Sequence, residues 1–516
     1  MTYLNENAIH NRGNINVPDQ SSPPVKLHEI KGNLKRKLSF PNEPSNKRCV
    51  PGRRLSTTRG TKCKKYHSHL VRKLLSRQMD NKGCRVFNKH ARTHERFRNF
   101  SLVSKLDSHA SKDASDFYKL CFLRNRSKVV EIVSAKDIVF GLTQTGVCTA
   151  FDRLTSKRIC FLNTEPDEVI RSLFYNKSND SLITVSVYRA DNYSSLKCKS
   201  TSLEYIRRNK PSKGFSLFET ESLRWPGFVE FDDVNGKVLT YSATNKVYKV
   251  WDLMNYNLLY AIVDANIQEI KISPGIMLLI YNRTSSKKNG KVTEHVPLKI
   301  LAIGSGETLK EFNHPIKPEK KIDFIEQFNE KLLVKQENEN LEIVDVRTSS
   351  VHNVDCTHFM TPSAFIFLYE NQLFLTFRDH IVSVWNFKGE LVTTFEDHML
   401  WHPDCNTNNI YITSQQDLII SYCKNKKQKH GFGQGLNRVS SGDEDDEHDE
   451  VSSKGSLNIS DIFTGKCLAK IVAKRSQSNY QEQLRALDDV TALYYNEELN
   501  EIYTGNKLGV VHCWSN

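Results

Sequence analysis

The chain has 516 residues, a formal net charge of +14 and 12 cysteines. The cysteines are too sparse and too irregularly spaced for the disulfide framework of a small secreted domain, which favours a reducing compartment. The longest apolar stretches, Ile276–Tyr281 and Ala364–Tyr369, are far shorter than the roughly 18 residues of a membrane-spanning helix, and Met1–Asn16 lacks a secretory-signal profile. We therefore expect a soluble protein that is neither exported nor inserted into a membrane.

The positive charge lies in the N-terminal part of the chain. Residues 1–116 contain 25 Lys and Arg against 9 Asp and Glu, whereas residues 117–516 contain 48 against 50. Residues 1–116 are also rich in Asn, Ser and Pro and poor in aromatic and β-branched residues, so they cannot bury a core. They are predicted to form a basic, mostly disordered arm that contacts nucleic acid, an acidic protein surface or the import machinery.

Two basic clusters in this arm, LKRKLSF and NKRCVPGRRLS, are separated by about ten residues, the form that importin grooves accept. They predict a nuclear import signal, and the alternative is a basic tail that only solvates the chain. The residues of the signal are Lys35, Arg36, Lys37, Lys47, Arg48, Arg53 and Arg54. Ser39 and Ser56 each follow an arginine by three residues, so phosphorylation there would add negative charge within the signal.

Residues 62–79 are an exception within the arm, because their apolar side chains recur at helical spacing opposite a basic face. They predict a short amphipathic helix that either docks on the protein's own globular part or contacts a partner or nucleic acid. Scattered cysteines and histidines around it fit no known zinc-ligand spacing, so we expect no metal there. These residues are Cys63, His67, His69, Cys84, His90 and His94.

From Phe117 onward, short β-branched and aromatic runs alternate with polar turns to the end of the chain, which predicts an all-β fold. One pattern recurs, a strand that ends in an aromatic or aliphatic residue followed by Asp, Asn or Ser. Copies lie at Val147–Arg153, Val247–Leu253, Leu341–Arg347, Ile381–Lys388, Leu457–Phe463 and Val510–Asn516, with degenerate copies at Thr201–Ile206 and Leu298–Gly304. Such repetition predicts a WD40-like β-propeller of seven or eight blades over residues 117–516, in which neighbouring sheets bury each other's faces.

The last copy ends at Asn516 with no fourth strand after it, while Phe117–Leu123 stands unpaired before the first copy. We expect the N-terminal side of the domain to supply the outer strand of the final blade, with Phe117–Leu123 in that role, because this pairing hides two sheet edges.

Residues 424–455 interrupt the repeats with a basic run followed by the acidic run SSGDEDDEHDE. This composition predicts a disordered loop. Ser440 and Ser441 stand in the context that acidophilic kinases prefer, and the loop is either inert, a contact for basic partners such as histones, or a contact for the protein's own arm. His398, His402 and Cys405 around Trp401 are interpreted as a packed loop between blades.

The Val250–Asp252 tripeptide VWD and the repeat rhythm resemble the WD40 superfamily, although its Gly-His dipeptide is missing nearly everywhere. Longer stretches resemble a plant family of WD40-like proteins, which implies a propeller scaffold and supplies no catalytic residue. They are WPGFVEFDDVNGKVLTYSA (Trp225–Ala243), QEIKISPGIMLLIY (Gln268–Tyr281), FIEQFNEKLLVKQENENLEIVDVR (Phe324–Arg347), FMTPSAFIFLYENQLFLTF (Phe359–Phe377) and WHPDCNTNNIYITS (Trp401–Ser414).

No nucleophile elbow, paired-carboxylate motif, dinucleotide loop or GxxxxGK[ST] phosphate loop is present in the sequence, so we expect no catalysis and no cofactor. The predicted function is a nuclear scaffold that binds proteins. One alternative is a substrate receptor of a cullin-type ubiquitin ligase, for which Asp345 and Arg347 are the candidate adaptor contacts, although Val344 stands where such receptors carry an aromatic residue. The other is non-sequence-specific nucleic-acid binding through residues 31–98.

Overall fold

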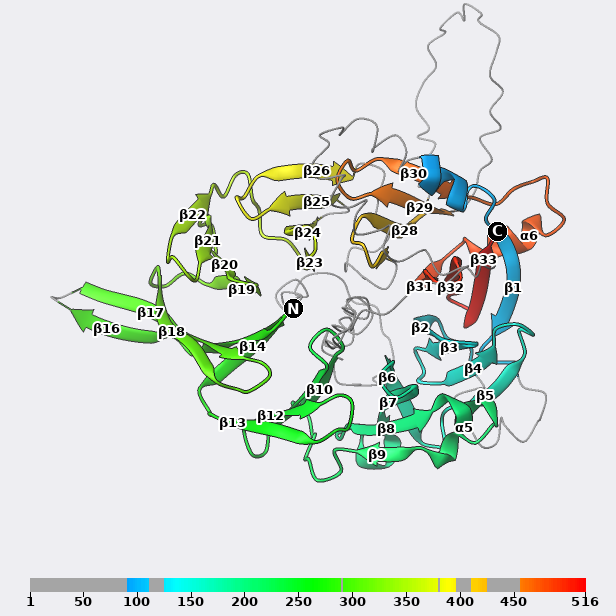
Figure 1. Cartoon of the computed structure of the whole chain (residues 1–516), viewed down its shortest axis with the longest axis horizontal. Coiled ribbons are helices and arrows are strands. Elements are labelled where there is room, and N and C mark those ends of the chain that lie inside the picture. The colour runs from blue at the N-terminus through cyan, green and yellow to red at the C-terminus, as the bar shows by residue number, and fades with distance from the viewer. Residues whose placement is uncertain (1–90, 111–124, 289–290, 379–380, 396–409, 425–454) are drawn as a thin grey trace, which may run out of the picture.

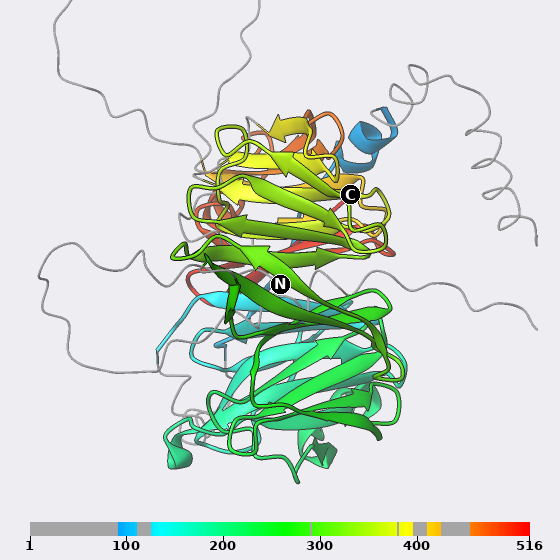
Figure 2. The same ribbon diagram turned by 90° about the vertical axis from the view of Figure 1, so that its left-hand side faces the viewer.

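The computed structural model describes residues 91–110, 125–288, 291–378, 381–395, 410–424 and 455–516. These residues form eight antiparallel sheets, seven of four strands and one of five, arranged like the blades of a wheel (Figure 1). Figure 2 shows the wheel from its side, with strands of neighbouring blades stacked face to face. The prediction of an all-β propeller of seven or eight blades is confirmed, and the described residues form eight blades.

The first strand of each blade lies nearest the centre of the wheel and the fourth lies on its rim (Figure 1). Blade 1 consists of β2 (Val129–Ala135), β3 (Ile138–Thr143), β4 (Cys148–Asp152) and β5 (Arg158–Phe161), and blade 2 of β6 (Glu168–Asn176), β7 (Ser181–Tyr188), β8 (Lys197–Ser202) and β9 (Phe215–Leu217). Blade 3 consists of β10 (Phe228–Asp232), β11 (Lys237–Ser242), β12 (Val247–Asp252) and β13 (Leu258–Val263), and blade 4 of β14 (Ile267–Ser273), β15 (Ile276–Tyr281), β17 (Lys291–Ala302) and β18 (Thr308–Ile316). Blade 4 also carries β16 (Thr284–Lys288), which extends the hairpin with β17 beyond the rim.

Blade 5 consists of β19 (Ile322–Phe328), β20 (Lys331–Gln336), β21 (Leu341–Asp345) and β22 (Val351–Val354), and blade 6 of β23 (Ala364–Leu368), β24 (Leu373–Arg378), β25 (Ile381–Asn386) and β26 (Leu391–Phe395). Blade 7 consists of β27 (Ile410–Ile412), β28 (Leu418–Lys424), β29 (Gly455–Asp461) and β30 (Cys467–Ile471), and blade 8 of β31 (Val490–Asn496), β32 (Glu501–Asn506), β33 (Val510–Ser515) and β1 (Ser101–Asp107). Short helices α5 (Leu203–Arg207) and α6 (Tyr480–Ala486) lie in the connections. The degenerate copy predicted at Thr201–Ile206 therefore covers only the last two residues of β8 and then enters α5, so the predicted strand was placed a few residues too far along the chain.

The repeated Asp or Asn at the end of the third strand has a local structural role. The Oδ1 of Asp345 accepts hydrogen bonds from the N–H groups of Arg347 and Thr348, both at 2.9 Å. Asp252, Asn386 and Asp461 accept from the residues two positions later, and Asp152 accepts from Thr155, three positions later. A side chain that caps its own turn in this way needs only nearby residues, so the turn recurs wherever the short motif does.

A buried tryptophan ties the third strand to the second in three blades. The Nε1 groups of Trp251, Trp385 and Trp514 donate to the Oγ1 atoms of Thr240, Thr376 and Thr504 at 2.9, 3.0 and 2.9 Å. Each indole is thereby buried with its only polar group satisfied, which burial of a tryptophan requires.

Neighbouring blades approach one another at the turn between the third and fourth strands. Gly306, Gly389 and Gly465 occupy this turn with φ of +75°, +76° and +68°, and each faces the fourth strand of the preceding blade. A Cβ built on Gly389 would stand 2.1 Å from Val354 Cγ2. Glycine at this position therefore permits both the left-handed turn and the close contact between blades 5 and 6.

Substitution of Gly389 by alanine is expected to cost more stability than substitution of Gly275, which has a similar φ of +79° but nothing within 4 Å of an added Cβ. Both variants bear a left-handed strain of about 1–2 kcal/mol, and Gly389→Ala adds about 1–3 kcal/mol of overpacking. Guanidinium unfolding of the two variants measures the difference. Equal losses would show that the turn relaxes away from Val354.

The ring is closed by β1, which pairs antiparallel with β33 from Ser101↔Ser515 to Asp107↔Val510. An N-terminal segment thus supplies the outer strand of the last blade, as expected, but the predicted segment was wrong, and Phe117–Leu123 lies outside the described residues. The propeller begins before the predicted boundary at residue 117. The alternation of buried Leu102 and Leu106 with exposed Val103 marks a strand, but it was obscured by the basic composition of the residues before it.

Candidate functional site

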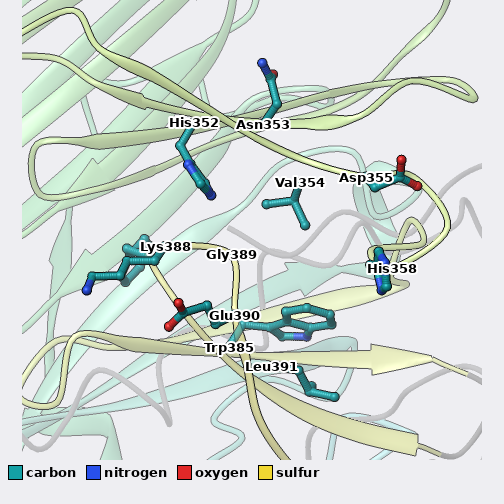
Figure 3. A pocket seen from close by; sticks show the side chains of 11 residues that line it. His352, Asn353, Val354, Asp355, His358, Trp385, Lys388, Gly389, Glu390 and Leu391 are labelled. Carbon is teal, nitrogen blue, oxygen red and sulfur yellow. The ribbon is translucent and has the colours of Figure 1, made fainter.

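A groove of about 710 Å³ lies on the rim of the wheel between blades 5 and 6 (Figure 3). One wall is β22 with the residues that follow it, and the other is the turn from β25 to β26. The lining residues are His352, Asn353, Val354, Asp355, His358, Trp385, Phe387, Lys388, Gly389, Glu390 and Leu391.

The wall formed by β22 is an edge strand. Among the described residues it pairs only with β21, so its outer side has no strand beside it. Figure 3 shows that His352 and Val354 point toward the opposite wall while Asn353 points away, as strand alternation requires. An exposed strand edge of this kind presents backbone groups to which another chain can pair.

The apolar floor of the groove is Trp385, whose orientation is fixed by a hydrogen bond and by ring packing. Trp385 is 8% exposed, donates its N–H to Thr376 and packs edge-on against Phe359 with ring centroids 5.1 Å apart. Leu391, by contrast, is 51% exposed in the lining of the groove. The groove therefore combines a rigid aromatic surface with an aliphatic side chain that a ligand would cover.

The two carboxylates of the groove are occupied in local hydrogen bonds. Asp355 accepts from the Thr357 hydroxyl at 2.6 Å and from its N–H at 2.8 Å, and these donors hold the pKa of Asp355 below its ordinary value. Glu390 accepts from Asn386 Nδ2 at 2.7 Å. Lys388 is exposed and forms no ion pair within the described part of the chain, and the same holds for His352. The groove thus carries two carboxylates that are hydrogen-bonded to neutral donors, together with the ammonium of Lys388.

Asp345 and Arg347, the predicted adaptor contacts, lie in the turn that precedes β22. Asp345 shapes this turn and forms an ion pair with Lys331 at 2.5 Å, and the Lys331 ammonium and the turn's N–H groups hold the pKa of Asp345 well below its ordinary value. Arg347 is 74% exposed and pairs with Glu330. Because four other blades carry an equivalent Asp or Asn, the carboxylate of Asp345 has a structural role and is not a feature of one blade.

Most of the other predicted sites lie outside the described residues. These are the seven import-signal residues, Ser39, Ser56, Ser440, Ser441, the helix at 62–79 and the histidines near Trp401. Of the loop predicted at 424–455, residues 425–454 also lie outside the described ranges, while Lys424 ends β28 and Gly455 begins β29. His94 is the one zinc candidate that is described, and it is exposed in a helical segment ending near Phe97. Within the described ranges no three His, Cys, Asp or Glu residues are arranged to hold a metal ion, and no helix is long and apolar enough to span a membrane.

Sequence reasoning missed the groove. It recognised Ile381–Lys388 as a blade motif, but His352 and Lys388 belong to different blades and nothing in their spacing brings them together. The available signal was Gly389 at a tight turn, since a glycine at a left-handed position allows a neighbouring backbone or side chain to approach closely.

The solved structures that match this chain are similar to it in fold alone. The computationally designed Ika8 protein is 15% identical, with a TM-score of 0.42 over 76% of this chain and 97% of that chain. BamB from Moraxella catarrhalis is 12% identical, with a TM-score of 0.37, and the C-terminal WD40 domain of Sif2 is 12% identical, with a TM-score of 0.42; each match covers 81% of this chain and 98% of the other. The fold assignment rests on the sheet topology described above.

No curated protein matches the chain in sequence. A family match extends over residues 85–514, from before the closing strand β1 to the penultimate residues of β33. The matching family is described as "Domain of unknown function (DUF7899)", and the chain belongs to this family.

Proposed function

We propose that this protein is a nuclear scaffold that binds other proteins through the rim of its propeller and catalyses no reaction itself. The observation that carries the proposal is the open edge of β22 beside a rigid apolar floor between blades 5 and 6. Propellers commonly carry their function in loops and surfaces placed on a stable ring. The basic clusters at residues 35–54 support entry into the nucleus.

Native purification of the full chain from nuclei tests the scaffold role. We expect a complex whose mass, measured by light scattering, exceeds the 59.4 kDa of the chain through a stoichiometric protein partner. A lone monomer with no partner would contradict the proposal. A cullin adaptor that is lost on Arg347→Ala would instead identify the ubiquitin-ligase alternative, and nuclease-sensitive association through residues 31–98 would identify the nucleic-acid alternative.

Alanine at Lys35, Arg36, Lys37, Lys47, Arg48, Arg53 and Arg54 is expected to leave a fluorescent fusion of the full chain in the cytoplasm. The charge that importin would recognise is removed, and all seven residues precede the described blades in the sequence. Alanine at Lys62, Lys64 and Lys65 is the control, because it removes basic residues of the same arm outside the two clusters. Nuclear fluorescence that is unchanged in the seven-residue variant would refute the import signal.

A further inference from the structure

We infer that blades 1 and 2 carry, on one face of the wheel, a contact surface for the phosphate backbone of a single-stranded nucleic acid. The inference goes beyond the proposed scaffold role and does not depend on it. It concerns residues of the propeller and is separate from the basic clusters of the arm.

The face in question is formed by two kinds of turn. In an antiparallel blade, the turn from the first strand to the second and the connection from the third strand to the fourth lie at the same end of the sheet. Neighbouring blades place these ends side by side, because Gly275 donates its N–H to Asn235 and Glu370 donates its N–H to Gln416 across blade boundaries. We call this end of the wheel the turn face.

The charge of the turn face is divided unevenly. Between the strands named above, its segments in blades 1 and 2 contain eight Lys and Arg against three Asp and Glu, whereas those in blades 3 to 8 contain three against eight. The cations of blades 1 and 2 are Lys136, Arg153, Lys157, Lys177, Arg207, Arg208, Lys210 and Lys213, and the acids are Asp137, Asp180 and Glu204. A polyanion that meets this face is therefore attracted to blades 1 and 2 and repelled by the rest.

Half of these cations belong to one enlarged connection, which joins β8 to β9 in blade 2. The equivalent connection is a short turn in blades 1, 3, 4, 5 and 7, such as residues 153–157 in blade 1, but in blade 2 it extends over residues 203–214. It contains α5 and a 3-10 turn at Pro211–Lys213. The short turn is sufficient to join two strands, so the added residues have another role.

The helix of this connection is anchored on one side and exposed on the other. Leu203 and Ile206 are at most 1% exposed and pack in the core between blades 1 and 2, and Figure 1 shows α5 beside β5 and β8. The N–H of Lys210 donates to the carbonyl of Tyr205 at 2.8 Å. The backbone that carries the cations is thus ordered before a ligand binds, which lowers the entropic cost of binding.

The three acids of this surface are already paired, and lysines remain. The pairs are Asp137 with Arg207, Glu204 with Arg208 at 2.7 Å, and Asp180 with Lys136 at 2.5 Å. Lys210 and Lys213 are exposed and form no ion pair with any described residue. Phosphate groups would therefore meet ammonium groups that no acid of the surface neutralises.

Two exposed aromatic rings accompany these lysines. Tyr205 on α5 is 44% exposed, and Phe215, the first residue of β9, is 57% exposed. Aromatic rings stack on unpaired bases while cations on the same surface follow the phosphates. An acidic peptide would use the cations but not the rings, and a duplex keeps its bases stacked on one another. The combination therefore favours a single strand.

The first test is the affinity of the full chain for a fluorescent single-stranded RNA oligonucleotide of mixed sequence, measured by anisotropy over a series of salt concentrations. Arg208→Glu/Lys210→Glu/Lys213→Glu is expected to lower this affinity about tenfold or more at low salt, and to make log affinity fall less steeply with log salt, because fewer phosphates are neutralised.

The matched control is Lys246→Glu/Lys317→Glu/Lys466→Glu, which reverses the same number of exposed charges outside blades 1 and 2. It is expected to change the affinity by less than about threefold, since it alters only the long-range field. A second measurement needs no substitution: RNA that contains 4-thiouridine is photo-cross-linked to the wild-type chain, and we expect cross-linked peptides that include Tyr205 or Phe215.

Four results would overturn the inference. They are an equal loss of affinity in both triple variants, no loss in either, cross-links confined to residues 1–98, and tighter binding of a duplex or of a poly-glutamate peptide than of the single strand. The last result would assign the surface to a duplex or to an acidic protein.

Discussion

Removal of residues 1–110 is expected to abolish cooperative unfolding of the entire propeller, whereas removal of residues 1–90 should leave the unfolding temperature unchanged. The longer deletion takes away β1 and leaves β33 with a bare edge. It also removes Phe97, Phe100, Leu102 and Leu106, each at most 7% exposed. At about 1.5–3 kcal/mol for each buried apolar side chain, their loss is comparable with the whole stability of a folded domain.

The closing strand is held at both ends, which explains why its loss should spread through the ring. Arg126 donates to both carboxylate oxygens of Asp107, at 3.1 and 2.7 Å, and to the carbonyl of Leu508. At the other end, Phe97 packs against Tyr495 with ring centroids 5.6 Å apart. A ring opened at one blade leaves two blades without a neighbour on one face, so both lose burial at once.

Scanning calorimetry of the two truncated chains measures this effect. Point variants on β1 provide a finer control, because Leu106→Ser removes a side chain that is 2% exposed while Val103→Ser changes one that is 61% exposed. Only the first should lower the unfolding temperature. A chain that lacks residues 1–110 yet unfolds in one transition at the original temperature would show that the ring closes without β1.

Lys271→Met is expected to destabilise the protein by about 3–5 kcal/mol, because it leaves a buried carboxylate without its partner. Lys271 on β14 and Glu326 on β19 are both 2% exposed, and their Nζ and Oε1 atoms are 2.9 Å apart. They occupy equivalent positions, two residues before the ends of the innermost strands of blades 4 and 5. Glu269 also pairs with Lys271.

The double variant Lys271→Met/Glu326→Met should recover most of this loss, because replacement of both buried charges by apolar side chains removes the desolvation penalty together with the attraction. Lys299→Met is the control within blade 4, since its partner Glu311 is 60% exposed and such pairs contribute at most about 1 kcal/mol. Urea unfolding of the three variants gives the free energies. If Lys271→Met lowers the free energy of unfolding no more than Lys299→Met does, the buried pair contributes nothing to the packing of blade 4 against blade 5.

The fold could be predicted to a large extent because the blade motif is local. The turn at Asp345 or Asp461 is made by hydrogen bonds between residues two and three positions apart, and the strands before it alternate within a few residues. The groove could not be predicted in this way. His352 and Lys388 meet only because β22 and the β25–β26 turn lie on adjacent blades, and no periodicity in the sequence expresses that contact.

The amino-acid sequence by itself determined that repeated small sheets follow a basic segment, and that this segment carries two clusters suited to nuclear import, because propensity, turn chemistry and charge act over short stretches of chain. Only the tertiary structure decided that there are eight blades, that Ser101–Asp107 closes the ring, and that Lys271 of one blade meets Glu326 of the next. Each of these depends on which distant segments become neighbours. That choice is made by burial of whole sheet faces against one another and not by any single stretch of residues.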